Sequence, residues 1–175
     1  TAWTHGVTGT ATSIAVGRLS HHFDFRGPAL AVDTACSSSL VAVDMAMRAL
    51  RYGECELAIA GGANILLSPD LHAGLARMGA LAADGRCKTF AAEADGYGRG
   101  EGAGLFVLKV RDGAEAEGDT IHGVLLGGAL NHDGASQNVT APNGQAQRQL
   151  LRRALWDADI AGSDVNWVET HGTGT

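Results

Sequence analysis

The stretch from Val32 to Leu40 constrains the fold most, because it predicts a strand end, a tight turn and a helix start in direct succession. Residues 30–32 are small or branched apolar residues that suit a buried strand. Cys36 follows in the turn, Ser37–Ser39 are cap-type residues, and Leu40 begins a long apolar run. A thiol there lies near the free N–H groups and positive dipole end of the helix, which favours the reactive thiolate. We expect Cys36 to be reactive, with a buried structural cysteine as the alternative.

The rest of the chain predicts helices and strands in alternation. We expect helices at 13–19, 40–52, 69–78 and 145–158, and strands at 30–32, 57–60, 104–110, 121–130 and 165–168. Gly53 is expected to end the second helix, and Ser68 to cap the third. Arg111, Asp112 and Gly113 are interpreted as a turn, and residues 131–144 as a polar loop. Such alternation is typical of an α/β fold with a mostly parallel sheet covered by helices.

Composition and charge exclude several function classes. The chain has 175 residues, enough for one domain with a core, and its 45% hydrophobic and 5% aromatic content predicts a core of aliphatic side chains. A formal charge of −6 argues against nucleic acid as a partner. No apolar run reaches the length of about 18 residues that a membrane helix needs. Because the chain starts without Met and stops inside a Gly/Thr motif, we interpret it as a fragment.

The three cysteines, Cys36, Cys55 and Cys87, are an odd number without CxxC spacing. This pattern argues against a disulfide framework and a structural zinc site, and it predicts a reducing, cytoplasmic compartment. His21 and His22 are adjacent and do not make a metal site alone, so no metal site is expected.

A second candidate reactive group follows the expected strand at 165–168. His171 precedes Gly172–Thr175, a backbone with little side-chain bulk against which a substrate chain could lie. Sites assemble at the carboxyl ends of strands in α/β sheets, and a thiolate paired with an imidazole is suited to acyl transfer. Pairing of Cys36 with His171 is therefore our hypothesis. A cysteine hydrolase and a non-catalytic scaffold stay open as alternatives, although no GxSxG or GxCxG elbow supports the hydrolase.

Two other motifs are weaker. Residues 98–104 contain a match to a dinucleotide-binding fingerprint, but an expected strand follows it where a helix is needed. Glu93, Asp95 and Glu101 could form an acid pair or a cation site, whereas a solvated loop or an ion pair with Arg99 is the favoured interpretation.

Five blocks of sequence resemble the β-ketoacyl synthase domain of modular type I polyketide synthases. They spread over nearly the whole chain in that family's order: VDTACSSSL at Val32–Leu40, GRCK at Gly85–Lys88, ADGYGRGEGAG at Ala94–Gly104, TAPNG at Thr140–Gly144 and HGTGT at His171–Thr175. The resemblance to the ketosynthase of animal-type fatty-acid synthase is somewhat weaker. Departures from the polyketide pattern include Ala91, where Asp is usual, and Thr170, where Ala is common.

The resemblance implies a thiolase-like fold with helix–sheet–helix–sheet–helix layers, dimeric through its N-terminal half. Residues 1–118 would form most of that half, and residues 119–175 would begin the C-terminal half. The family's second active-site histidine and the loop that gives half of its oxyanion hole would lie beyond Thr175.

The resemblance also implies the chemistry of polyketide chain elongation by decarboxylative Claisen condensation. Cys36 would carry the acyl chain as a thioester, and His171 would assist decarboxylation of a malonyl-type unit. Thr173 and Thr175 match positions that contact the phosphopantetheine arm of an acyl carrier protein. No cofactor would be bound directly. The implied partners are the acyl carrier protein, an acyltransferase and other domains of the same megasynthase, and a second copy of the chain.

Overall fold

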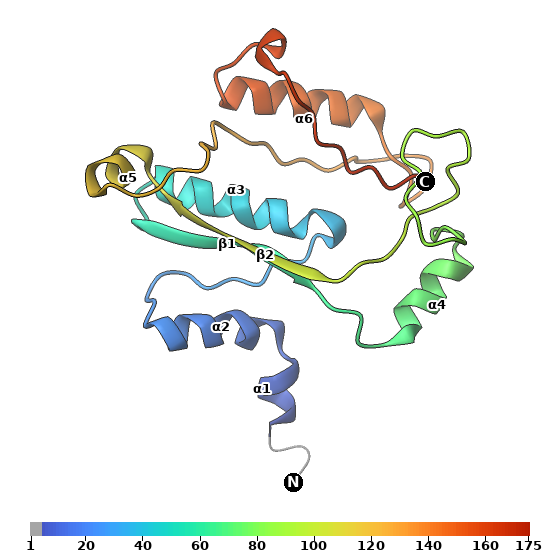
Figure 1. Ribbon diagram of the computed structural model, residues 1–175, viewed down its shortest axis with the longest axis horizontal. Coiled ribbons are helices and arrows are strands. Elements are labelled where there is room, and N and C mark those ends of the chain that lie inside the picture. Colours follow the sequence, from blue (N-terminus) through green and yellow to red (C-terminus); the bar gives the residue numbers. More distant parts are fainter. Residues whose placement is uncertain (1–4) are drawn as a thin grey trace. The chain divides into compact units, whose positions relative to one another are not determined.

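The computed structural model describes residues 5–175, which form short helices and one pair of strands (Figure 1). In chain order the elements are α1 (Gly6–Thr10), α2 (Thr12–Phe23), the 3-10 turn η1 (Ala35–Ser37), α3 (Ser38–Arg51), β1 (Leu57–Asn64), α4 (Pro69–Arg77), β2 (Gly102–Lys109), α5 (Arg111–Glu117), α6 (Gly144–Asp157) and the 3-10 turn η2 (Gly162–Asp164).

Side-chain caps mark the starts of α4 and α6, and a glycine marks the end of α3. The Ser68 side chain accepts a hydrogen bond from the Asp70 N–H ahead of α4, whose first residue is Pro69. At α6 the Asn143 side chain accepts from two backbone N–H groups of the first turn. The chain leaves α3 through Gly53, whose φ of +70° suits glycine. The predicted helices at 40–52, 69–78 and 145–158 are confirmed within a residue or two.

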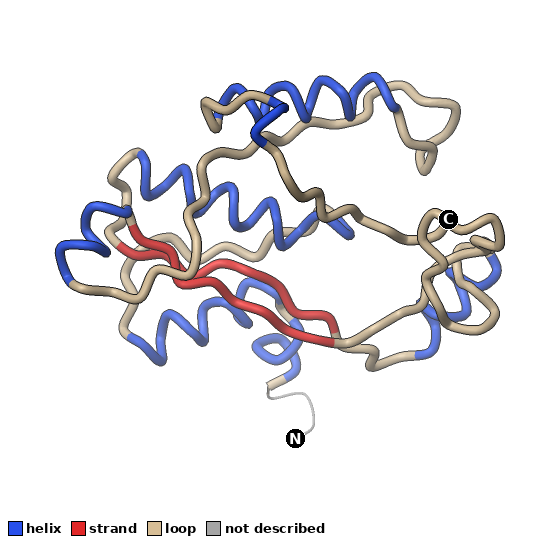
Figure 2. The backbone as a smooth tube through the Cα atoms, turned by 45° about the horizontal axis from the view of Figure 1, so that its top comes forward, coloured by secondary structure: helices blue, strands red, loops and turns tan. Residues whose placement is uncertain are grey.

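The two strands pair with each other, and the chain runs along them in opposite directions, so they are antiparallel (Figure 1). The Asn64 side chain, at the end of β1, donates to the Gly100 carbonyl just ahead of β2. Figure 2 shows the pair as the only strands drawn within residues 5–175. The expected mostly parallel sheet is therefore wrong for the part of the chain described. A β-ladder is defined by backbone hydrogen bonds to a neighbour, and alternation of elements alone does not supply that neighbour.

Three expected strands are absent for the same reason. Residues 30–32, 121–130 and 165–168 have no ladder partner, although their sequences suit strands. Several of their apolar side chains are exposed, among them Leu30, Val124 and Val168. The apolar pattern of the sequence therefore identified segments that suit a strand. It did not identify which other strands would pair with them. The expected turn after β2 is also wrong, because Arg111–Glu117 forms the helix α5, which ends at Gly118 with φ +73°.

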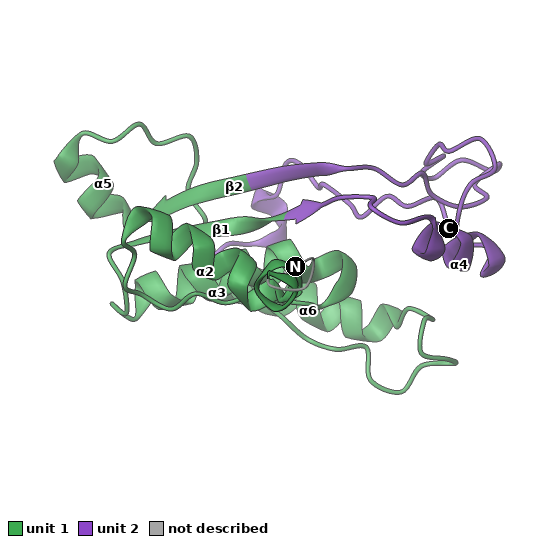
Figure 3. Cartoon of the chain, turned by 90° about the horizontal axis from the view of Figure 1, so that it is seen from below, with its two compact units in different colours: residues 1–62, 105–159 green, residues 63–104, 160–175 purple. Residues whose placement is uncertain are grey.

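The chain divides into two compact units, coloured separately in Figure 3. Unit 1 comprises residues 1–62 and 105–159, and unit 2 comprises residues 63–104 and 160–175. The division falls inside both strands. Among residues 5–175, none of the helices has the length and apolar character needed to cross a bilayer.

Unit 1 is built around α3. In Figure 1, the strand pair is drawn between α3 and α2. Met47 and Leu50 of α3 are buried, as are Ala60 of β1 and Ala114 of α5. Gly62 permits close approach of β1 to α3, because a Cβ there would lie 2.9 Å from the Ser39 Cβ.

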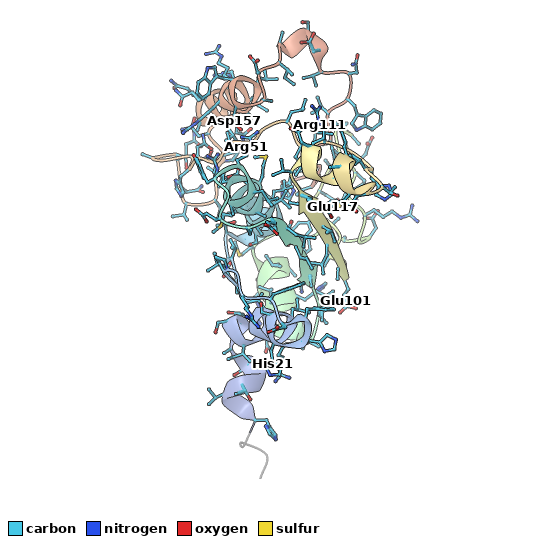
Figure 4. All side chains as sticks on the ribbon, turned by 90° about the vertical axis from the view of Figure 1, so that its left-hand side faces the viewer. His21, Arg51, Glu101, Arg111, Glu117 and Asp157 are labelled. Atoms are coloured by element: carbon cyan, nitrogen blue, oxygen red, sulfur yellow. The ribbon has the colours of Figure 1, made fainter. Side chains whose placement is uncertain are left out.

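One ion pair joins α3 to α6 inside unit 1. Arg51 donates to Asp157 at 3.0 Å and to the Leu126 carbonyl, and Asp157 also accepts from the Gly128 N–H (Figure 4). The hydrogen bond from the Gly128 N–H has the largest effect on the pKa of Asp157, and the bond from Arg51 has the next largest. Both hold that pKa below its usual value. Asp44 of α3 is buried, and its carboxylate accepts a hydrogen bond from the Arg48 side chain at 2.7 Å.

Candidate active site

The Cys36 turn in unit 1 is held by hydrogen bonds within its own few residues. The Ala35 N–H donates to the Asp33 carboxylate at 3.1 Å, and the Thr34 N–H donates to the Ser38 hydroxyl at 2.9 Å. The Ser38 hydroxyl donates in turn to the Ala35 carbonyl at 2.6 Å. Ala35 takes a φ of +54°, a left-handed conformation that costs a non-glycine residue about 1–2 kcal/mol. The turn therefore stores strain directly before the thiol.

This geometry presents the thiol to solvent. Cys36 is exposed and free, and it sits in η1 immediately ahead of α3. The serines do not cap the helix as expected. Ser37, at the N-cap position, makes no side-chain bond to a helix N–H and instead donates to the Thr34 carbonyl at 2.9 Å. The hydroxyls thus stabilise the turn rather than close the end of the helix. The expected reactivity of Cys36 stays a prediction.

The His171 loop in unit 2 is held by a distant part of the chain. The Thr89 hydroxyl donates to the Gly172 carbonyl, and the Gly96 N–H donates to the Gly174 carbonyl at 3.0 Å. Gly172 and Gly174 have φ values of +62° and +72°. A Cβ on Gly174 would lie 3.0 Å from the Gly96 carbonyl oxygen, so glycine is required there for both conformation and space.

The segment that contacts this loop is held by ion pairs. Lys88 pairs with Asp84 at 2.8 Å and with Asp95 at 2.5 Å. The hydrogen bonds to Asp84 and then to Asp95 raise the pKa of Lys88, and the bond from Lys88 lowers the pKa of Asp84. Both carboxylates are partly exposed, so water screens these pairs. We call residues 84–96 the anchoring segment.

A cavity of about 510 Å³ lies between the anchoring segment and the His171 loop. Residues 170–175 line it from one side, and Thr89, Phe90, Ala91 and Ala94 line it from the other. Phe90 is exposed and has a φ of +62°, which is uncommon for a bulky residue. Sequence reasoning missed Thr89 and Phe90 as site residues. The GRCK block just before them was the available signal, but spacing does not reveal which distant loop they contact.

The predicted site residues fall into two groups. His171, Thr173 and Thr175 share one loop of unit 2, where the hydroxyls of Thr173 and Thr175 lie 2.9 Å apart. Cys36 belongs to unit 1, and its pairing with His171 stays a prediction. His171 is exposed, and its ring makes no hydrogen bond within residues 5–175.

The weaker motifs take structural roles. The Glu101 carboxylate accepts from the Leu66 N–H at 2.5 Å, and Asp95 pairs with Lys88 rather than with a neighbouring arginine. Residues 102–104 begin β2, which disagrees with the helix that a dinucleotide fingerprint requires. Across residues 5–175 there is no cluster of His, Cys, Asp and Glu suited to a metal ion.

Two family models match the chain in succession. The model of the beta-ketoacyl synthase N-terminal domain matches residues 1–114, and that of the C-terminal domain matches residues 122–175. This chain belongs to the beta-ketoacyl synthase family. Cys36 and the anchoring segment of this ketosynthase chain lie in the N-terminal match, and the His171 loop lies in the C-terminal match.

Curated relatives of the ketosynthase chain are large polyketide synthases. It is 52% identical over 171 residues to the phenolphthiocerol synthesis polyketide synthase type I Pks15/1 of Mycobacterium bovis, covering 98% of this chain and 8% of that protein. It is 51% identical over 168 residues to the erythronolide synthase EryA3 of Saccharopolyspora erythraea, covering 96% of this chain and 5% of that protein.

Solved ketosynthase structures share the fold of this chain. The oxazolomycin ketosynthase domain OzmH KS7 of Streptomyces albus matches with a TM-score of 0.92 and 45% identity, over 94% of this chain and 30% of that one. The ketosynthase from module 6 of the bacillaene synthase of Bacillus subtilis matches with a TM-score of 0.93 and 40% identity, over 95% and 30%. The ketosynthase chain therefore spans a small part of these relatives.

Proposed function

We propose that this chain is part of a ketosynthase that elongates a polyketide by decarboxylative Claisen condensation. In this proposal Cys36 holds the growing acyl chain as a thioester. The observation that carries the proposal is the exposed thiol on a strained turn, directly before α3, in a chain matched by both ketosynthase family models. Strained backbone at a reactive residue is typical of sites where geometry matters more than local stability.

The first step proposed is transfer of the acyl chain. The Cys36 thiolate attacks the carbonyl carbon of an acyl thioester on the acyl carrier protein, the new carbon–sulfur bond forms, and the carrier thiolate leaves. Reactants and products are both thioesters, so the exchange is close to thermoneutral. The open turn supports this step because the Cys36 side chain is exposed to solvent.

The second step proposed is condensation. A malonyl-type unit on the carrier loses CO₂, and the resulting enolate attacks the acyl thioester carbon on Cys36, which expels the Cys36 thiolate as the carbon–carbon bond forms. His171 would stabilise the enolate oxygen as it develops, a role in which one lost donor costs about 2.7–4 kcal/mol of barrier. The exposed imidazole beside a cavity supports this assignment.

Binding of the phosphopantetheine arm is assigned to Thr173 and Thr175. Their hydroxyls, 2.9 Å apart on the cavity wall, offer donors and acceptors to the amides of such an arm. This assignment requires no directly bound cofactor. The partners we propose are an acyl carrier protein, an acyltransferase and other domains of a cytoplasmic megasynthase, with a second copy of the chain in a thiolase-like dimer.

The competing functions are less well supported. A ketosynthase of fatty-acid synthesis would share the site, but the relatives named above are polyketide synthases. A cysteine hydrolase would need water at the thioester, and both halves of the chain match condensing-enzyme models instead.

The test uses the full-length protein with Cys36→Ala, and Cys55→Ala as the control because Cys55 is also a free thiol. Acyl loading from a carrier-bound thioester is measured by mass spectrometry. We expect Cys36→Ala to abolish loading without affecting dimerisation, and we expect Cys55→Ala to load at the normal rate. Intact loading on Cys36→Ala would refute the role. Rapid release of free acid by the unmodified protein, without elongated product, would favour the hydrolase.

A further inference from the structure

One hydrogen bond joins the anchoring segment to the peptide that follows the proposed catalytic histidine. The Thr89 hydroxyl donates to the carbonyl of Gly172, the residue after His171. Thr89 lies in the N-terminal family match and Gly172 in the C-terminal match, so the bond crosses between the two halves of the family's sequence pattern while staying inside unit 2.

The Thr89 side chain also lies close to Gly172. A Cβ on Gly172 would lie 3.3 Å from the Thr89 hydroxyl oxygen and 3.4 Å from its methyl carbon. The hydroxyl therefore bonds the carbonyl, and a side chain at position 172 would crowd Thr89. Thr89 is itself half-buried and follows Lys88, which the carboxylates of Asp84 and Asp95 hold in place.

The His171 ring has no comparable support of its own. It is exposed and makes no hydrogen bond to any residue in the described range 5–175. Its position therefore depends on its backbone, which is tied at Gly172 to Thr89 and at Gly174 to Gly96. The Gly96 bond joins two backbone groups, so Thr89 is the side chain that holds the peptide next to His171.

We propose that Thr89 is a positioning residue for His171 in the condensation step. The inference rests on the proposed function, because it assumes that His171 acts on the malonyl-type unit. Loss of the hydroxyl frees the Gly172 carbonyl and lets the histidine shift. A displacement of about 1 Å at a reacting group can cost a hundredfold in rate. Acyl loading on Cys36 does not use the His171 imidazole in the proposed mechanism, so it should change much less than decarboxylation.

The experiment compares Thr89→Val, which keeps the shape and removes the hydroxyl, with Thr89→Ser, which keeps the hydroxyl. Both are made in the full-length protein. Thr10→Val serves as a matched control, because the Thr10 hydroxyl also donates to a carbonyl, that of Gly6, but inside a helix of unit 1. Acyl loading is followed by mass spectrometry, and CO₂ release from malonyl carrier protein gives kcat and KM. Thermal unfolding is recorded for every variant.

For Thr89→Val we expect the kcat of decarboxylation to fall about tenfold to a hundredfold, with much smaller changes in KM and in loading. Thr89→Ser and Thr10→Val should stay within about twofold of the unmodified protein. Normal decarboxylation by Thr89→Val would overturn the inference, and so would a parallel loss of loading, decarboxylation and thermal stability. An unmodified protein that loads acyl groups without decarboxylating would instead refute the proposed function.

Discussion

The Cys36 turn and the His171 loop present their reactive groups by opposite means. The hydrogen bonds of the Cys36 turn stay within Asp33–Ser38, whereas the His171 loop depends on residues 88–96, far earlier in the chain. A turn built from neighbours forms with its own segment. A loop built from distant contacts forms only when the two segments are brought together, which costs loop-closure entropy. The nucleophile is thus fixed locally and the histidine by long-range packing.

The largest expected effect comes from breaking the long-range support. Gly96 has a φ of +140°, and a Cβ there would lie 2.4 Å from the Ala82 nitrogen and 2.8 Å from the Ala80 oxygen. Gly96→Ala should therefore lower the free energy of unfolding by about 3 kcal/mol or more, measured by urea denaturation. Gly100→Ala is the control, because no atom lies within 4 Å of the added Cβ and the φ is ordinary. Equal stability of the two variants would contradict the described packing.

The local support is tested at Ser38, whose hydroxyl accepts from Thr34 and donates to Ala35. Ser38→Ala removes both bonds, each of which contributes about 1 kcal/mol, and frees the strained Ala35. We expect acyl loading on Cys36 to slow about tenfold and the free energy of unfolding to fall by about 1–2 kcal/mol. Ser39→Ala is the matched control, because its hydroxyl makes no hydrogen bond within residues 5–175. A Ser38→Ala protein that loads at the normal rate would show that the hydroxyl does not shape the turn.

The same contrast explains how much of the molecule the sequence could predict. The start of α4 at Ser68-Pro69 and the end of α3 at Gly53 follow from capping chemistry, which acts over a few residues. The helix that follows the Cys36 turn was also predicted, although Ser37 does not cap it. The segment 121–130 was expected to be a strand because it is apolar, but pairing depends on a neighbour that local sequence does not specify.

Parts of the candidate site were unpredictable on the same grounds. The HGTGT block identified His171 as a candidate, yet nothing near it in sequence indicates that Thr89 holds Gly172. The left-handed φ of Phe90 was also not predictable, because phenylalanine rarely adopts that conformation. Contacts between distant segments become visible only in coordinates.

The smallest expected effect is a difference in how the stability of the two regions depends on pH. The anchoring segment carries the Lys88 pairs with Asp84 and Asp95, whereas the Cys36 turn relies mostly on hydroxyl and backbone groups. Because the pKa of Asp84 lies below its usual 3.8 in the folded state, its stabilising effect is present above that pH and is lost as the pH falls through the lowered value. The pKa of Lys88 lies above 10.5, so its effect is present below that pH and is lost as the pH rises further.

Lys88→Gln removes both effects at once. We expect the variant to be slightly less stable than the unmodified protein from about pH 5 to pH 9, with the difference shrinking at both extremes. Arg26→Gln is the control, because it also removes one cation from an ion pair, but both partners of that pair are exposed to solvent. Ser38→Ala should show a deficit that stays constant over the same range, since its bonds involve no titrating group. A constant deficit for Lys88→Gln would mean that the lysine supports the anchoring segment by packing its stem, and that charge contributes nothing to holding His171.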